Sequence, residues 1–299
     1  MPNVAVVIPV RDRAAMVVEA IASVTAQTHR DFGIVVVDDG SRDGSADAAE
    51  AALADAALPA RVLRQPGRGV AAARNAGAAV LDARWIAFLD SDDLWLPQKL
   101  ARQMAWLEAR AGYRLAQTEE RWIDAGRHRN PRAWHRKEED LFTRSLARCL
   151  VSPSAVVMAR ALFDAHGGFD EAFPVCEDYE LWLRVTAREP VGLVPGALVV
   201  KRGGHPDQLS RSTWGLDRWR VAALAKLLMT APLDDEARAA VAAVARAKCA
   251  VLAGGAARRG RDDEAARYRR LAHAIATAAT PTIAAAVGDP GTCGREAAS

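Results

Sequence analysis

Blocks of apolar and polar positions alternate along the first hundred residues of the chain. Four short apolar or β-branched runs predict strands, at residues 4–8, 34–37, 61–64 and 85–89. Alanine-rich stretches with apolar residues at helical spacing predict helices between them, at residues 14–27, 47–58, 70–81 and 97–108. The run at 34–37 is apolar throughout, which is typical of a strand covered on both faces. The alternation therefore predicts right-handed βαβ units, a mostly parallel sheet flanked by helices and an α/β fold class.

Beyond residue 108 the pattern is less regular. Further strands are predicted at residues 112–124, 154–158, 191–194 and 197–200, a helix at 177–187 and a long polar loop at 125–140. From Trp214 the pattern is helical only, with segments at 218–229, 234–253 and 262–278 separated by Pro232 and by glycines between 254 and 260. We divide the chain into a catalytic domain at 1–212, a helical C-terminal extension at 213–279 and a flexible tail at 280–299. We interpret the extension as a packing or assembly appendage, with a platform for an acceptor or partner as the alternative.

Carboxylates follow two of the predicted strands. The sequence FLDSDD at 88–93 ends the fourth strand, and VVDDGS at 36–41 ends the second. Three carboxylates at one strand end are costly to hold together unless a cation or hydrogen-bond donors compensate them. Mg²⁺ in proteins takes one or two carboxylates and completes its shell from phosphate and water. Because ligands of parallel sheets bind beyond the carboxyl ends of the strands, this edge is predicted to hold a metal and a phosphorylated ligand. The alternative is that Asp92 or Asp93 caps the following helix.

Composition narrows the class of protein. The net charge of +3 and the pI near 8.8 suit an anionic ligand or contact with acidic lipids, but no dense basic face indicates nucleic-acid binding. Four cysteines without paired spacing argue against a zinc site or a disulfide framework. Neither a secretory signal nor a transmembrane segment is predicted. We expect a cytoplasmic protein that is able to contact a membrane peripherally.

Five motifs together resemble the family 2 glycosyltransferases. Their order and spacing match over residues 3–205, about two thirds of the chain: VIPVRDR at 7–13, VVDDGS at 36–41, GVAAARNAG at 69–77, FLDSDD at 88–93 and CEDYELWLR at 176–184. The resemblance implies a GT-A fold with a Rossmann-like nucleotide-binding half. It also implies an inverting transferase that uses a nucleotide-diphosphate sugar, with a UDP-sugar as the expected donor.

The resemblance implies donor-binding roles for the residues at the strand ends. Asp39 is expected to accept a hydrogen bond from the base ring, with Pro9 and Arg11 lining the same pocket. Asp90 is expected to contact the ribose, with Ser91 beside it. The donor-side loop and helix start are expected to contribute Gly69, Arg74 to neutralise phosphate, and Asn75 to bond the ribose or a neighbouring carboxylate.

The metal and the catalytic base are implied in the same way. Asp92 is expected to hold Mn²⁺ or Mg²⁺ against the diphosphate, and Asp93 to act as a helix cap or a supporting group. Asp178 matches the family's catalytic base, with Glu177 supporting it; the alternative is a pair that caps the helix. The glycine-flanked segment at 203–210 suggests a mobile flap, in which His205 is a further candidate for the metal.

The function predicted from these residues is metal-dependent, inverting transfer of one sugar to a hydroxyl of a glycan, lipid-linked or small-molecule acceptor. A sugar-phosphate nucleotidyltransferase is one alternative, although it would require a glycine-rich loop directly after the first strand, and residues 9–13 contain no glycine. A catalytically silent nucleotide-sugar-binding scaffold is another. Residues 67–72 also fit the dinucleotide fingerprint loosely, but they follow a polar strand instead of the first strand of a unit.

Overall fold

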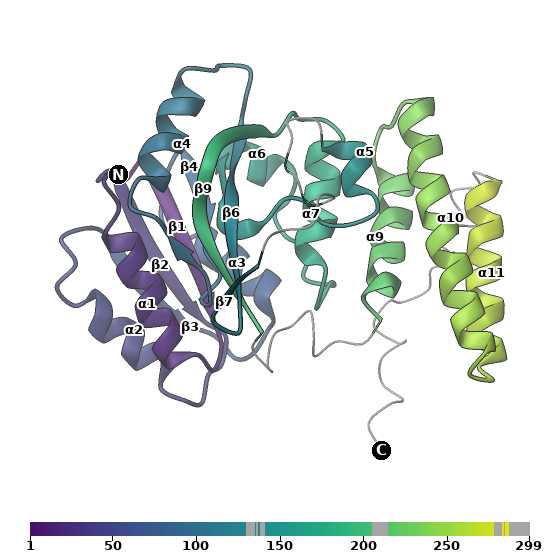
Figure 1. Cartoon of the computed structure of the whole chain (residues 1–299), viewed down its shortest axis with the longest axis horizontal. Coiled ribbons are helices and arrows are strands. Elements are labelled where there is room, and N and C mark those ends of the chain that lie inside the picture. Colours follow the sequence, from purple (N-terminus) through teal and green to yellow (C-terminus); the bar gives the residue numbers. More distant parts are fainter. Residues whose placement is uncertain are drawn as a thin grey trace.

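A single twisted sheet with helices on both faces forms the larger part of the molecule, and three helices stand beside it (Figure 1). The computed structural model describes residues 1–129, 135, 137, 141–204, 215–277, 283, 285 and 286. The strands of this described part are β1 (Val4–Val10), β2 (Phe32–Asp38), β3 (Ala60–Arg64), β4 (Trp85–Phe88), β5 (Leu94–Trp95), β6 (Leu115–Asp124), β7 (Arg127–Arg129), β8 (Val156–Ala159) and β9 (Gly192–Gly203). The α-helices are α1 (Ala14–Thr25), α2 (Ser45–Leu53), α3 (Val70–Ala78), α4 (Lys99–Glu108), α5 (Phe142–Ser145), α6 (Arg160–Ala165), α7 (Glu177–Thr186), α9 (Leu216–Thr230), α10 (Asp235–Ala257) and α11 (Asp262–Ala276).

The first four strands of the α/β unit are parallel, as the alternating pattern predicted. They lie in the order β3-β2-β1-β4, and every residue of β1 and β2 is buried. Their carboxyl ends meet at one edge, where Val10 pairs with Asp38 and Val7 pairs with Phe88. The acidic segments that follow β2 and β4 therefore lie side by side.

The second half of the sheet is mixed, whereas the pattern suggested a mostly parallel one. β8 runs antiparallel to both β4 and β6, and β9 runs parallel to β6 but antiparallel to β5. Because β8 is antiparallel to both neighbours, it is not part of a βαβ unit, which joins parallel strands. A short 3-10 turn, η2 (Pro153–Ala155), leads directly into it. As a result, residues of β9 lie next to the segment that follows β4.

Two boundaries predicted from the sequence are wrong. The predicted strands at 191–194 and 197–200 are one strand, β9, whose register with β6 shifts around Pro195 and Gly196. Gly196 has a φ of +100°, a backbone conformation that other residues rarely adopt. The helix expected to break at Gly254 continues through it to Ala257, since a single glycine weakens a helix without ending it.

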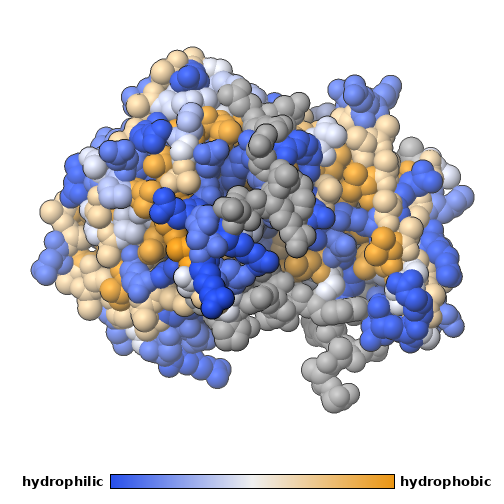
Figure 2. Space-filling view, in the orientation of Figure 1, coloured by the Kyte–Doolittle hydropathy of each residue, from blue (hydrophilic) through white to orange (hydrophobic). Residues whose placement is uncertain are grey.

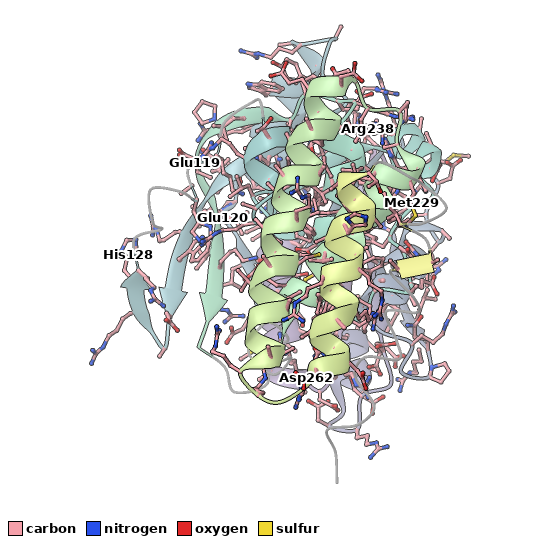
Figure 3. All side chains as sticks on the ribbon, turned by 90° about the vertical axis from the view of Figure 1, so that its right-hand side faces the viewer. Glu119, Glu120, His128, Met229, Arg238 and Asp262 are labelled. Atoms are coloured by element: carbon pink, nitrogen blue, oxygen red, sulfur yellow. The ribbon has the colours of Figure 1, made fainter. Side chains whose placement is uncertain are left out.

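The C-terminal helices share a hydrophobic core with the catalytic part of the chain. This cluster joins Tyr179 and Leu183 of α7 to Leu224 of α9, Val241 of α10 and Leu271 of α11. Figure 3 shows α10 and α11 side by side, with Met229 and Arg238 near the connection from α9. Lys226 of α9 also pairs with Glu180 of α7 at 2.6 Å. The extension is therefore packed into the molecule and is not a separate body.

The hydropathy of the surface differs between the sheet and the C-terminal helices. On the face that Figure 2 shows, weakly hydrophobic residues lie over α10, and the surface over β7 is hydrophilic. α10 is the one helix of the described residues that is long and apolar enough to cross a membrane by length and composition, with a mean hydropathy of 1.4. About a third of that apolar stretch is buried, against its neighbouring helices.

Candidate active site

Three carboxylates converge directly after β4. Asp90, Asp92 and Asp93 each offer an oxygen, and these oxygens lie within 4.8 Å of one another. The chain turns sharply here, since the Asp93 amide donates to the Asp90 carbonyl at 2.9 Å. β5 begins at the next residue, Leu94, and its pairing with β9 holds the chain in place directly after the turn. The local fold thus forces the acidic segment into a compact cluster.

Each of these carboxylates has its own cation from a different part of the chain. Arg74 of α3 is 2.7 Å from Asp90, and Arg13, between β1 and α1, is 2.6 Å from Asp92. Lys201 of β9 lies 3.5 Å from Asp93. Each carboxylate of the cluster therefore has a cationic side chain beside it.

Burial and these cations set the protonation of the cluster. Burial opposes the charge of Asp90, but Arg74, Lys201 and Arg13 outweigh it, so the pKa of Asp90 lies below its usual value. Asp93 is 1% exposed, and burial together with the charges of Asp92 and Asp90 raises its pKa to about 7, against the opposing effect of Lys201.

Asp93 is not a helix cap. Its carboxylate accepts hydrogen bonds from Ser154 Oγ at 2.6 Å and from the Arg202 amide at 3.1 Å. Ser154 Oγ also accepts from the Asp90 amide at 3.1 Å. Asp93 therefore supports the cluster by joining it to η2 and to β9. This is the supporting role that was expected as the alternative to a helix cap.

Arg74 connects the acidic cluster with the start of α7. Its guanidinium is buried, donating to Asp90 at 2.7 Å and to Glu177 at 2.6 Å, and it stacks 5.0 Å from the Phe169 ring. Burial, with a further contribution from Asp178, raises the pKa of Glu177 to about 7, against the opposing effect of Arg74. Arg74 is 4% exposed and links the two acidic motifs through its two carboxylate partners. Its expected contact with donor phosphate stays a prediction.

Asp178 follows Glu177 in the first turn of α7. Its Oδ1 accepts from the Tyr179 amide at 2.6 Å, and its Oδ2 accepts from the Cys149 thiol at 3.5 Å. Burial and the neighbouring Asp178 carboxylate raise the pKa of Cys149 well above its ordinary value, so this thiol keeps its proton. Asp178 is half-buried, and its role as a base stays a prediction.

Asp39 organises the loop that leads into α3. Its carboxylate accepts from Gln65 Nε2 at 2.6 Å and from the amides of Arg68 and Gly69 at 2.7 and 2.9 Å. Gly69 has a φ of +96°, so it turns the chain into the helix in a conformation reserved for glycine. Arg11 is exposed and 3.8 Å from Asp39, which places it over this loop.

The remaining predicted donor residues lie at the same sheet edge. Pro9 is buried in β1 opposite Val37, and Ser91 is buried within the acidic turn. Asn75 donates to the Phe169 carbonyl at 2.8 Å and to Glu171 Oε1 at 3.1 Å, and it accepts from the Phe169 amide. Asn75 thus contacts a neighbouring carboxylate, one of its two expected partners. His205 lies outside the described residues, as does most of the predicted flap.

The carboxylates after β4 fit a hard divalent metal. They supply oxygen ligands from one short segment, and Asp90 and Asp92 remain partly exposed on the side of the sheet edge. Mg²⁺ and Mn²⁺ favour such oxygen donors, with further positions left for phosphate and water. Asp92, with Asp90 beside it, would hold the ion, while Asp93 is taken up by Ser154 and the Arg202 amide.

Several residues of the site were not found from the sequence. Arg13 was noted only as a basic residue at this edge, and Lys201 and Ser154 were not singled out at all. Lys201 lies in β9 and Ser154 in η2, and both reach the cluster only through the pairing of the mixed half of the sheet, so no local motif indicates them. A polar residue within an apolar strand, as at Lys201, was the one available signal.

Comparisons with known proteins identify the class. The sequence profile described as "Glycosyl transferase family 2" matches residues 5–165, more than half of the chain. An uncharacterized glycosyltransferase of Rickettsia felis is 29% identical over 190 residues, which cover 64% of this chain and 31% of that relative. The chain belongs to glycosyl transferase family 2. The matched region spans about a third of the length of this Rickettsia relative.

Other similar proteins carry more specific names. The Escherichia coli protein named UDP-Glc:alpha-D-GlcNAc-diphosphoundecaprenol beta-1,3-glucosyltransferase WfaP is 26% identical over 63% of this chain and 72% of its own. TarS of S. aureus, solved in complex with UDP, has a TM-score of 0.67 and 17% identity over 96% of this chain and 90% of that one. A mannosyltransferase of Pyrobaculum calidifontis, solved with GDP-Man and Mn²⁺, has a TM-score of 0.60 and 19% identity over 97% and 86%. These solved structures establish the GT-A-type fold, with the C-terminal helices included in the match.

Proposed function

We propose that the protein is a metal-dependent, inverting glycosyltransferase that moves one sugar from a nucleotide-diphosphate sugar to a hydroxyl group of a glycan, lipid-linked or small-molecule acceptor. Family membership supports a glycosyltransferase over the nucleotidyltransferase alternative. A UDP-sugar is the proposed donor, in line with the names of WfaP and the UDP complex of TarS, whereas the Pyrobaculum relative binds GDP-Man.

The observation that carries this proposal is the junction between the two acidic motifs. Arg74 bridges Asp90, in the cluster after β4, and Glu177, next to Asp178 at the start of α7. A donor held at the cluster and an acceptor deprotonated by Asp178 would therefore react within one rigid frame. Fixing two reactants in this way supplies a large part of a transfer reaction's acceleration.

The proposed reaction uses the chain's own residues as follows. Asp39 holds the loop of Gln65, Arg68 and Gly69 that would line the nucleotide pocket. Asp178 would take the proton from the acceptor hydroxyl as its oxygen attacks the anomeric carbon of the sugar. A divalent metal bound at Asp92 would act as a Lewis acid that offsets the charge of the departing diphosphate.

Exchange of the proposed base tests this function. Asp178→Asn retains the shape and a hydrogen-bond acceptor for the Tyr179 amide but does not take up a proton at neutral pH. We expect donor nucleotide and Mn²⁺ to bind nearly as in the wild type, while the turnover number falls by about a hundredfold or more. Steady-state kinetics and calorimetric titration with UDP and Mn²⁺ measure the two effects separately.

The stereochemistry of the product is the second measurement. Because attack would come from the face opposite the leaving diphosphate, an α-linked donor should yield a β-linked product. Proton NMR of the wild-type product reads the anomeric configuration directly. A retained configuration, or normal turnover by Asp178→Asn, would mean that the mechanism or the assignment of the base is incorrect.

A further inference from the structure

The ion pair between Arg13 and Asp92 lies within the candidate metal site. Arg13 Nη1 is 2.6 Å from Asp92 Oδ2, and the two side chains are only 15% and 13% exposed. The proposed function assigns the metal to this same carboxylate. A divalent cation at Asp92 must displace the guanidinium or share the carboxylate with it, because two cations on one carboxylate repel each other at short range.

The main chain holds Arg13 firmly while its side chain spans the gap to Asp92. Its amide donates to Ser45 Oγ at 2.8 Å, and its carbonyl accepts from the Val17 amide at 3.0 Å in the first turn of α1. These two bonds fix the main chain of Arg13 at the start of α1 and do not involve its guanidinium. Its planar guanidinium has several donors and is suited to diphosphate oxygens as well as to a carboxylate.

The other two cations of the cluster contact other carboxylates. Arg74 has a second carboxylate partner, Glu177, at 2.6 Å and is buried. Lys201 donates to Ser152 Oγ at 3.0 Å and faces the inner carboxylate, Asp93. Arg13 is thus the cation that contacts the residue assigned to the metal.

We propose that Arg13 is an exchangeable counter-ion of the metal site. It pairs with Asp92 when no metal is bound and transfers to the donor diphosphate when a divalent cation takes its place. An ion held at Asp92 brings its phosphate ligands within a few ångströms of that carboxylate, and so within the reach of Arg13. This inference rests on the proposed function, since it needs a metal at Asp92 and a diphosphate ligand.

The exchange couples two binding events. Metal frees Arg13 for the diphosphate, and the diphosphate draws Arg13 away from Asp92, so each ligand should strengthen the binding of the other. Such a coupling free energy is reciprocal by thermodynamic necessity. The site should therefore bind metal and nucleotide together more tightly than the two separate affinities would give.

Binding of Mn²⁺ alone tests the first half of the exchange. Free Mn²⁺ is measured by electron paramagnetic resonance in titrations of the full chain, as wild type and as Arg13→Gln and Arg13→Lys. We expect Arg13→Gln to bind Mn²⁺ about five- to tenfold more tightly, because the competing charge is gone. Arg13→Lys keeps a cation and should remain near the wild type. Arg61→Gln, an exposed exchange on β3 with the same change in net charge, should leave the affinity unaltered.

Nucleotide binding tests the second half. Calorimetric titrations with UDP, GDP and dTDP at saturating Mn²⁺ should show weaker binding to Arg13→Gln by about tenfold for the nucleotide that the wild type prefers. Tighter metal binding together with weaker nucleotide binding is the signature of the exchange. General damage to the site would weaken both, and thermal melting of each variant checks the fold.

Asp92→Asn separates failure of the inference from failure of the proposed function. If Asp92→Asn leaves the Mn²⁺ affinity unchanged, the metal is not at Asp92, and both proposals fall. If Asp92→Asn weakens Mn²⁺ binding but Arg13→Gln does not strengthen it, the metal site stands and the exchange is refuted. Weaker Mn²⁺ binding by Arg13→Gln would likewise refute the exchange, since it would mean that Arg13 helps Asp92 to hold the metal.

Discussion

Buried charged side chains at this sheet edge are arranged in pairs and not as isolated groups. Arg74 between Asp90 and Glu177 illustrates the reason, because a charge removed from water is tolerated when hydrogen-bonded partners of opposite sign replace the lost hydration. Removing one member leaves the other uncompensated, which is why such residues are sensitive positions. Arg74 offsets the burial of its two partners unequally: the pKa of Asp90 is lowered, with Lys201 and Arg13 contributing, whereas that of Glu177 is raised to about 7.

Glu177 should make the stability of the protein depend on pH. Its pKa is raised from 4.5 to about 7 on folding, so the folded state binds the proton more strongly. The associated stabilisation is complete below about pH 4.5 and is lost as the pH rises through about 7. In Glu177→Gln this dependence disappears. We expect the free energy of unfolding of the variant, relative to the wild type, to increase by about 2–3 kcal/mol between pH 5 and pH 8.

Urea unfolding in the presence of a chelator, at several pH values, measures this difference. A constant offset between variant and wild type carries no information, since the exchange also alters the pair with Arg74. The control is Glu189→Gln, which makes the same change of charge at a carboxylate paired with Arg114. A flat profile for Glu177→Gln would contradict the raised pKa.

The sequence indicates the candidate carboxylates of the site, but it does not indicate which cationic side chains pair with them. Asp39, Asp90 and Asp92 were found because each follows an apolar run that ends at the same sheet edge. The pairing of Arg74 with Glu177 could not be predicted, since those residues lie 103 positions apart and meet only through the packing of α3 and α7. Arg13 was visible in the sequence, but its partner Asp92 depends on how tightly the turn after β4 closes.

The close fit of α3 on the sheet positions the donor-side residues. A Cβ on Gly77 would lie 2.4 Å from Val7 Cγ1 and 3.0 Å from Val37 Cγ2, and both valines are fully buried. Only glycine allows the helix to approach β1 and β2 this closely. Because α3 also carries Arg74, the distance between helix and sheet determines whether Arg74 reaches Asp90.

Gly77→Ala should therefore destabilise the protein despite the higher helix propensity of alanine. Overpacking against a rigid sheet costs about 1–3 kcal/mol, more than the gain in propensity. Denaturant unfolding measures the loss. Gly254→Ala in α10 is the matched control, because its nearest neighbour is the end of Arg258 at 3.6 Å, and it should be neutral or stabilising by up to about 1 kcal/mol. Equal behaviour of the two variants would mean that α3 is free to shift.

The periodicity of the sequence predicts the longer helices of the α/β part, but it does not predict its very short or irregular elements. The helices over 14–25 and 70–78 lie within their predicted spans because their apolar spacing is clear. The two-residue β5 and the four-residue α5 are too short to show any period. In β9, Pro195 and Gly196 signalled a break that turned out to be a local irregularity in the pairing with β6, since neighbouring backbone bonds hold the strand together on both sides.

At the scale of the whole molecule, the C-terminal helices pack on the same helix, α7, that carries part of the site. The core cluster shared by α7, α9, α10 and α11 buries Leu224 completely at the centre of α9. The sequence suggested an appendage because the change in pattern at Trp214 is abrupt. Contacts between Leu183 of α7 and this cluster could not be read from either segment alone.

Leu224→Ala should lower the stability of the whole chain. Loss of a fully buried leucine costs about 2–5 kcal/mol. Because α9 and α7 share a core, we expect one calorimetric unfolding transition, shifted to a lower temperature as a whole. Val251→Ala on the exposed side of α10, where the valine is 65% exposed, should change little. Two transitions, of which only one moves, would show that the extension unfolds independently.

The matching of Asp90, Asp92 and Asp93 with Arg74, Arg13 and Lys201 also bears on how an anionic ligand first reaches the protein. Three uncompensated carboxylates would surround this sheet edge with a repulsive potential extending about 10 Å at ordinary salt. A cation beside each carboxylate weakens that potential at its source. A diffusing nucleotide then meets a smaller electrostatic barrier, and its capture depends more on contact and fit than on long-range steering.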